Sequence, residues 1–144
     1  MYKFEKSLGR LSQQVSKALG RRLEERFMIA GKSINGTEWS IISMLKHKGC
    51  TTQLCIGTTL EMDKVSLTRA LSSLEKMNLL SRSPLKDDLR INEVSLSVEG
   101  ERVYSSLAPL AEDTLNEAFR GIDSREADLL MSLLERVHRN LNHR

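Results

Sequence analysis

The feature that most constrains this chain is a change in the spacing of its apolar residues. Over most of the 144 residues they recur every three or four positions, which is the period of one face of an α-helix. Between Asn78 and Val98 the spacing becomes two, the period of a strand with one buried face. The pattern therefore predicts a mainly helical protein with two short strands.

Six helical segments follow from the apolar pattern. Residues suited to helix starts are Thr37, Thr51 or Thr52, Asp63, and Asp123 or Ser124, and residues suited to helix ends are Gly49 and Asn78. A proline at position 109 favours a kink in the fifth helix. The expected helices cover about residues 3–27, 38–48, 54–60, 63–78, 98–119 and 123–141.

The two strands flank a charged segment that has the character of a hairpin tip. Leu80 and Arg82 belong to the first strand, and Val94, Leu96 and Val98 alternate with polar residues in the second. A proline at position 84 argues against a central position for the first strand.

Size and composition restrict the class of protein. A chain of 144 residues forms one domain, and 4% aromatic residues favour a core of aliphatic side chains. No window approaches the roughly 18 apolar residues of a membrane span, and no secretory signal opens the chain. We therefore expect a cytoplasmic protein without a membrane partner, whose Cys50 and Cys55 remain thiols.

Charge is distributed unevenly along the chain. The net charge is +3 and the pI is about 9.0. Residues 1–48 carry 10 Lys and Arg against 4 Asp and Glu, residues 49–98 carry 6 against 6, and residues 99–144 carry 6 against 9. This balance permits binding to nucleic acid without requiring it.

Two helices joined by a tight turn and followed by a charged hairpin predict a winged helix-turn-helix. In such a unit the second helix of the pair enters the major groove of DNA, and its polar side chains donate to phosphates or base edges. Arg69 is the strongest candidate because a guanidinium can bind guanine at two points. The full set on this helix is Lys64, Ser66, Thr68, Arg69 and Ser72.

Two motifs resemble those of MarR-type (multiple-antibiotic-resistance-type) regulators. The segment LTRALSSLEKMNLLSR, from Leu67 to Arg82, is similar to the family pattern T-R-x-x-x-x-L-E-x-x-G-L-I-x-R, with Asn78 at the glycine position. The following pattern D-x-R-x-x-x-x-x-L-[ST]-x-x-G is matched by Asp88, Arg90, Leu96, Ser97 and Gly100. The resemblance extends over essentially the whole chain.

The resemblance implies a fold and a function. The fold is mainly α, a winged helix-turn-helix with long N- and C-terminal dimerisation helices at about residues 1–30 and 100–144 and a DNA-binding region at about 37–99. Arg90 reaches into the minor groove from the wing, and Asp88 orients it or pairs elsewhere in the domain, while Lys86 and Arg82 neutralise phosphates. The expected protein is a transcriptional regulator of the repressor type that binds double-stranded DNA as a homodimer on a pseudopalindromic operator.

Many relatives bind aromatic acids or other hydrophobic compounds between the winged unit and the dimerising helices. The resemblance therefore implies a small aromatic or hydrophobic effector, with Arg21, Arg22, Trp39 and Met44 as candidate lining residues. The plainer interpretation is a core position for Trp39 and a solvated or phosphate-facing position for the arginines.

Other chemistry has weaker support in the sequence. His47, Cys50 and Cys55 match no common zinc spacing and lack a fourth ligand, so no metal or other cofactor is expected. No catalytic motif is present, so an enzyme is not expected. Two alternatives stay open: a winged-helix protein–protein interaction module without DNA binding, and a redox-responsive regulator acting through Cys50 or Cys55.

Overall fold

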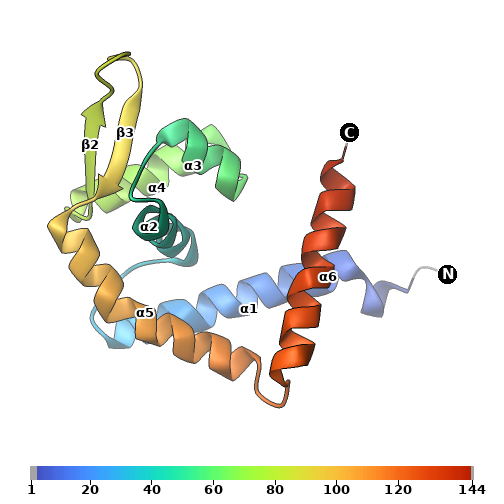
Figure 1. Ribbon diagram of the computed structural model, residues 1–144. Helices are drawn as coiled ribbons and strands as arrows, with labels where there is room; N and C mark the ends of the chain where they lie inside the picture. Colours follow the sequence, from blue (N-terminus) through green and yellow to red (C-terminus); the bar gives the residue numbers. More distant parts are fainter. Residues whose placement is uncertain (1–2, 144) are drawn as a thin grey trace.

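The computed structural model describes residues 3–143, and in this range there are six α-helices and a small three-stranded sheet that lies at one edge of the molecule (Figure 1). The strands are β1 (Cys50–Thr52), β2 (Leu80–Pro84) and β3 (Asn92–Leu96). A short 3-10 helix, Phe4–Lys6, precedes the first α-helix. The α-helices are α1 (Leu8–Ile29), α2 (Gly36–Lys48), α3 (Gln53–Leu60), α4 (Lys64–Lys76), α5 (Val98–Ala118) and α6 (Ser124–Asn142). The predicted mainly helical winged-helix class is confirmed.

Side-chain caps fix the helix pair α3 and α4 as the sequence predicts. The Thr52 hydroxyl accepts a hydrogen bond from the backbone N–H of Cys55 at 3.1 Å, and the Asp63 carboxylate accepts one from Ser66 at 2.8 Å. Glu61 lies between the two helices in the left-handed conformation, with φ 52°. The tight turn thus begins with a residue type that rarely adopts this backbone geometry.

Two helix starts differ from the prediction. Ser7 caps α1, so this helix begins at Leu8 rather than at residue 3. Asn35 caps α2 in place of Thr37, because its carboxamide oxygen accepts a hydrogen bond from the backbone N–H of Glu38 at 2.8 Å. Thr37 consequently lies within the first turn of the helix.

The sheet has the order β1-β3-β2, with both pairs antiparallel. Thr51 of β1 and Arg82 of β2 both pair with Val94 of the central strand. Pro84 lies at the end of the edge strand β2, where its missing N–H leaves no interior hydrogen bond unmade. The strand β1 was not predicted, since three residues are too few to show a period.

The core forms around α2, which runs through the middle of the winged unit (Figure 1). Aliphatic side chains from α2, α3, α4, α5 and β3 meet there, and full burial of each such side chain stabilises the fold by about 1.5–3 kcal/mol. The fully buried members are Phe27, Ile41, Ile42, Leu45, Ile56, Leu71, Leu74, Val94 and Leu107.

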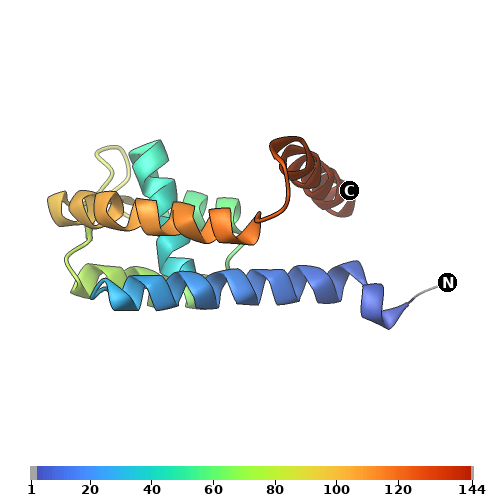
Figure 2. The same ribbon diagram turned by 90° about the horizontal axis from the view of Figure 1, so that it is seen from below.

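The two long helices α1 and α5 run side by side in opposite directions beneath the winged unit, and α6 stands apart from them (Figure 2). None of the described residues of α6 is buried. His138 of α6 nevertheless reaches the turn between α3 and α4, where its Nε2 lies 3.0 Å from Oε1 of Glu61. The last helix therefore exposes an apolar stripe while its polar side touches the winged unit.

Candidate nucleic-acid interface

The outer face of α4 gathers most of the side chains predicted to contact DNA. The opposite face of the helix is buried through Leu67, Leu71 and Leu74, which turns the polar residues outward. One open surface on this face is lined by Lys64, Val65, Thr68, Arg69, Ser72, Ser73 and Lys76. Four of the five predicted α4 residues therefore share one surface.

Ser66, the fifth predicted residue, is engaged in the helix cap. Its hydroxyl donates to Oδ2 of Asp63 at 2.7 Å, in addition to the backbone hydrogen bond. These bonds, the backbone one first, hold the pKa of Asp63 below its ordinary value. The charged carboxylate thus stays at the N-terminus of α4, where it interacts favourably with the helix dipole.

Arg69 and Arg82 have different surroundings. Arg69 is exposed and forms no ion pair with any of the residues that the structure describes. Arg82 forms an ion pair with Glu75 of α4, and its Nη1 donates to Oε1 of Gln53 at 3.4 Å. The guanidinium of Arg82 is therefore already occupied, whereas that of Arg69 is available to a ligand.

Gln53 joins the three elements that present the candidate interface. As the first residue of α3, it accepts from Arg82 of β2 and donates through Nε2 to the Thr68 hydroxyl of α4 at 3.4 Å. Gln53 belongs to none of the sequence motifs described above. Its place directly after the cap of α3 is the one sequence signal that points to it.

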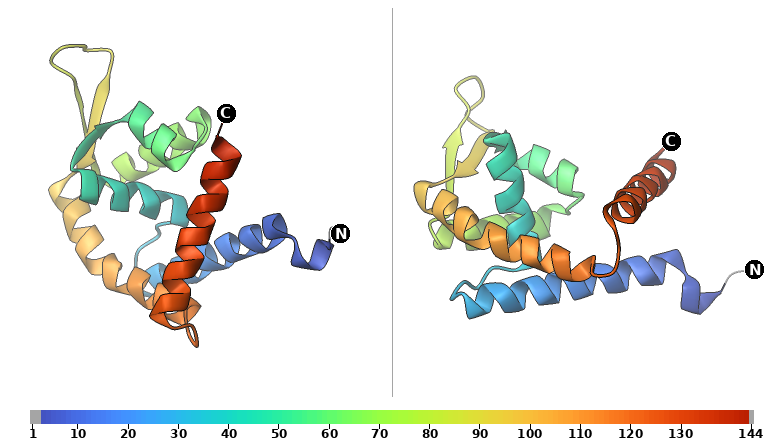
Figure 3. Two further views of the ribbon diagram at one scale, coloured as in Figure 1. Left: turned by 45° about the vertical axis from the view of Figure 1, so that its right-hand side comes forward. Right: turned by 60° about the horizontal axis from the view of Figure 1, so that its bottom comes forward.

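The wing places a tethered arginine at its tip. The hairpin of β2 and β3 projects from the body beside α3 and α4 and away from α1 (Figure 3). Oδ1 of Asp88 accepts from the backbone N–H of Arg90 at 3.0 Å and from its Nε at 3.1 Å, and Oδ2 accepts from Nη2 at 3.2 Å. The Arg90 side chain is still 91% exposed. Lys86 is also exposed on this tip.

The Asp88 contacts orient Arg90 without burying it. Hydrogen bonds from the side chain and then from the backbone of Arg90 hold the pKa of Asp88 below its ordinary value, so the carboxylate remains a charged acceptor. The turn itself is closed by backbone bonds from Leu85 to Ile91 and from Ile91 to Asp88. The wing therefore presents a pre-oriented cation.

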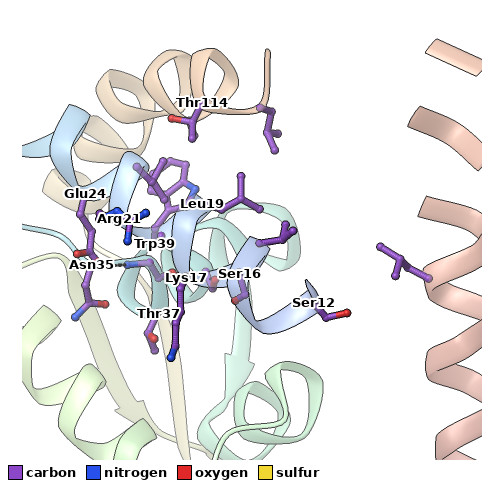
Figure 4. Close-up of a pocket in the computed structure, with 18 of the residues that line it drawn as sticks. Ser12, Ser16, Lys17, Leu19, Arg21, Glu24, Asn35, Thr37, Trp39 and Thr114 are labelled. Carbon is purple, nitrogen blue, oxygen red and sulfur yellow. Dashed lines mark hydrogen bonds between the residues drawn. The ribbon is translucent and has the colours of Figure 1, made fainter. Parts of the chain in front are cut away.

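A separate open groove of about 1300 Å³ lies between α1, the start of α2, α5 and α6 (Figure 4). Of the four candidate effector residues, Arg21 and Trp39 line it. The other two do not: Arg22 pairs with Glu25 and Glu117, and Met44 is buried in the core. Trp39 also has a structural role, since it stacks on Tyr104 with ring centroids 5.4 Å apart.

Residues 3–143 contain neither a candidate metal-binding cluster nor a candidate membrane-spanning helix. Within this range no three His, Cys, Asp or Glu side chains are placed to hold a metal ion. No helix in the same range has the length and apolar character needed to cross a membrane.

Comparisons with known proteins show which proteins this chain resembles in sequence. A family model described as MarR family matches residues 34–91. An uncharacterized HTH-type transcriptional regulator of Bacillus subtilis, YdgJ, is 26% identical over 131 residues, which are 91% of this chain and 77% of that protein.

Solved structures are similar over nearly the whole chain. A mutant of Escherichia coli MarR in complex with operator DNA has a TM-score of 0.82 at 25% identity, covering 90% of this chain and 92% of that one. Bordetella bronchiseptica BpsR, whose DNA binding is regulated by 6-hydroxynicotinic acid, has a TM-score of 0.85 at 18% identity, covering 96% and 97%. At 18% identity, the similarity to BpsR shows a shared fold.

Proposed function

We propose that this chain is a member of the MarR family of transcriptional regulators, whose family model matches residues 34–91, and that it binds a pseudopalindromic operator as a homodimer and represses transcription there. The observation that carries this proposal is the exposed Arg69 on the outer face of α4, which forms no ion pair within residues 3–143, beside a wing whose tip holds Arg90. Residues 37–99 form the DNA-binding region, and the helices within about 1–30 and 100–144 dimerise. The regulator is not an enzyme.

The proposed homodimer is supported by apolar surface that one chain leaves uncovered. Leu8, Leu11 and Val15 of α1 are 46–56% exposed, and Leu130 and Leu134 of α6 are 43% and 39% exposed. All five line the open groove, where a second copy of the same helices would cover them. A two-fold dimer presents its two α4 helices to successive major grooves, with half-sites roughly 34–36 Å apart.

Each cation has its own role in the proposed complex. Arg69 reads a base pair in the major groove, Arg90 enters an A·T-rich minor groove, and Lys86 contacts a phosphate. Arg82 supports the wing through Glu75 and Gln53, and its contribution to phosphate binding is secondary. Lys64, Thr68 and Ser72 complete the contacts made by α4.

Substitutions separate these roles. Arg69→Ala should cost about 1–3 kcal/mol of binding free energy per contacted base pair and relax the preferred sequence, while Lys86→Ala should weaken binding to all sequences alike and lower the salt slope by about 1.

Arg90→Ala should lose affinity selectively for operators with A·T-rich flanks. Fluorescence anisotropy over a salt series measures all three. Binding that lacks both salt sensitivity and sequence selectivity would instead support a protein–protein interaction module.

We also propose that the end of the open groove next to the start of α2 (Figure 4), rather than the apolar part that a second copy would cover, admits an anionic aromatic effector. Lys17 and Arg21 come from successive turns of α1, and the first turn of α2 contributes Gly36 and Thr37. The two cationic side chains attract a carboxylate and Trp39 offers an apolar contact, whereas the N–H of Gly36 at the start of α2 already donates to Oε1 of Glu24 at 3.1 Å. A ligand there would favour dimers whose α4 helices are wrongly spaced for two grooves.

Linkage gives this control a quantitative test. Operator DNA must weaken effector binding by the same factor by which the effector weakens DNA binding. Calorimetry with 6-hydroxynicotinic acid as the first probe, on the protein with and without operator, measures both factors. Equal affinity in both states, together with clear release of DNA, would exclude this mechanism.

A thiol-based control is a second candidate, and the surroundings of Cys55 favour it. The Nζ atom of Lys48 lies 3.7 Å from its Sγ atom, and the Thr59 hydroxyl lies 3.9 Å from it. Both contacts stabilise a thiolate within the helix-turn-helix.

A further inference from the structure

Val65 is the apolar member of the surface that α4 presents to DNA. It is the second residue of the helix and is 67% exposed. Lys64, Thr68 and Arg69 line the same surface around it. Val65 does not belong to the buried stripe of α4, which consists of Leu67, Leu71 and Leu74.

Folding of α4 gives no reason for a valine at this position. A β-branched side chain lowers helix propensity, and an exposed one gains little from burial. The first turn of a helix favours acidic residues, but after the capping Asp63 the first turn of α4 contains Lys64, Val65 and Ser66 and no further acid. Both Lys64 and Val65 are thus unfavourable for the isolated helix, and a ligand on this face would account for both.

We propose that Val65 determines specificity by contacting the C5-methyl group of one thymine in each half-site, an inference that rests on the DNA binding proposed above. In the major groove the thymine methyl is the apolar group by which a base pair can be recognised. An exposed valine cannot hydrogen-bond to a base edge, so its contribution to base recognition is restricted to this methyl.

The position of this thymine relative to the base pair read by Arg69 follows from helix geometry. Val65 and Arg69 are four positions apart on the helix, so both side chains lie on one face, about 6 Å apart along the helix axis. Successive base pairs are about 3.4 Å apart. The thymine therefore lies within about two base pairs of the one that Arg69 contacts.

The test removes the methyl group from the DNA, which leaves the folding of the protein untouched. An operator is first selected from a random duplex library with the full chain. Each dT of one half-site is then replaced in turn by dU, and affinity is measured by anisotropy. We expect one position at which the wild type loses about fourfold, the value of one buried methyl-sized group, and about sixteenfold when both half-sites are changed.

Protein variants complete a double-mutant cycle. Val65→Ala should bind the dT and dU operators equally, and Val65→Thr, with the same shape and one methyl fewer, should show a reduced dU effect. Val98→Ala is the matched control, because Val98 is 71% exposed at the start of α5 and should keep the full dU effect.

Each remaining outcome has a distinct meaning. A wild type that is indifferent to every dU replacement, or a Val65→Ala protein that keeps the full dU effect, overturns the role of Val65 while DNA binding stands. Failure to select any operator, with wild type and controls alike, overturns the proposed function itself.

Discussion

Gly100 closes the contact between α5 and the connection from α4 to β2. A Cβ atom on this residue would collide with the backbone carbonyl oxygen of Leu79, which also accepts a hydrogen bond from the N–H of Ser97 at 3.0 Å. The Cα atom of Gly100 and the carbonyl of Leu79 both belong to the backbone, so neither can move aside as the end of a flexible side chain would. We therefore expect Gly100→Ala to lower the free energy of unfolding by about 1–3 kcal/mol in urea denaturation.

Gly57 is the matched control for this prediction, because it also lies within a helix. Its added Cβ would lie 3.2 Å from Cδ2 of Leu67, the end of a flexible side chain. The gain in helix propensity of up to about 1 kcal/mol offsets that crowding. Gly57→Ala should leave stability within about 1 kcal/mol of the wild type, and equal losses in both variants would contradict this account.

The two cysteines should differ in reactivity. Hydrogen bonds from the Thr51 and Thr59 side chains, followed by the charge of Lys48, lower the pKa of Cys55. Partial desolvation and the Glu93 carboxylate raise the pKa of Cys50. Between pH 7 and 8 the thiolate fraction of Cys55 therefore exceeds that of Cys50, and Cys55 should be alkylated first by iodoacetamide.

Peptide mapping by mass spectrometry at several pH values checks the order of alkylation. Lys48→Gln should slow the reaction of Cys55 and leave that of Cys50 unchanged, which separates the effect of the charge from simple exposure. If operator binding survives complete alkylation of Cys55, thiol-based control of DNA binding is excluded.

At the scale of elements, one contact joins the wing to the helix that precedes it. Arg82 of β2 pairs with Glu75 of α4, and both side chains are half-buried. Removing one partner leaves the other charge poorly compensated, so Arg82→Ala should destabilise the fold more than Arg90→Ala, whose side chain is exposed. Thermal unfolding without DNA measures the difference.

A second variant separates stability from phosphate contact. Glu75→Ala removes no positive charge, but it should destabilise the fold as Arg82→Ala does. In the Glu75→Ala, Arg82→Ala double mutant the two losses should not add. Full additivity would mean that the pair is not coupled, and the earlier assignment of Arg82 to a phosphate would then regain weight.

Local signals explain what the sequence could predict at this scale. The sequence predicts caps at Thr51 or Thr52 and at Asp63, because a capping residue and the helix it starts are neighbours in the chain, and the structure has them at Thr52 and Asp63. The choice of Thr37 over Asn35 was wrong, because both residue types cap helices and only the backbone geometry, extended at Asn35, distinguishes them.

Non-local pairing explains what the sequence could not predict. The strand β1 exists because Cys50–Thr52 pairs with β3, which is far away in the chain. Likewise, the motif at Arg82 gave no indication that Glu75 and Gln53 occupy its guanidinium. Of the candidate effector residues, Arg22 faces Glu117 on α5, a contact that no pattern within α1 indicates.

At the scale of the whole molecule, α6 poses the main energetic question. It is an amphipathic helix with a capping box at Asp123 and Glu126, yet none of its described residues is buried. A helix of this length gains most of its stability from packing of its apolar face. The second copy proposed above supplies that packing, so folding of α6 and dimerisation should be coupled.

Charge placed on the apolar stripe of α6 tests this coupling. Leu130 and Leu134 lie one turn apart and line the groove, so Leu130→Glu with Leu134→Glu should prevent a second copy from binding there. Ser132→Glu is the control, because Ser132 is exposed and lies on the other side of the same helix. Together with the native Glu135, it also places two carboxylates one turn apart. Light scattering should give twice 16.3 kDa for the wild type and the control and 16.3 kDa for the double variant.

The same variants connect assembly to function. A dimer holds two α4 helices at a fixed spacing, so contact with one half-site makes contact with the next intramolecular and strengthens binding by about 10²–10⁴-fold. The double variant should lose an advantage of that size on a two-half-site operator and almost none on a single half-site. A monomeric double variant that still binds the full operator as the wild type does would show that one chain suffices, and the two-fold arrangement proposed for the complex would have to be abandoned.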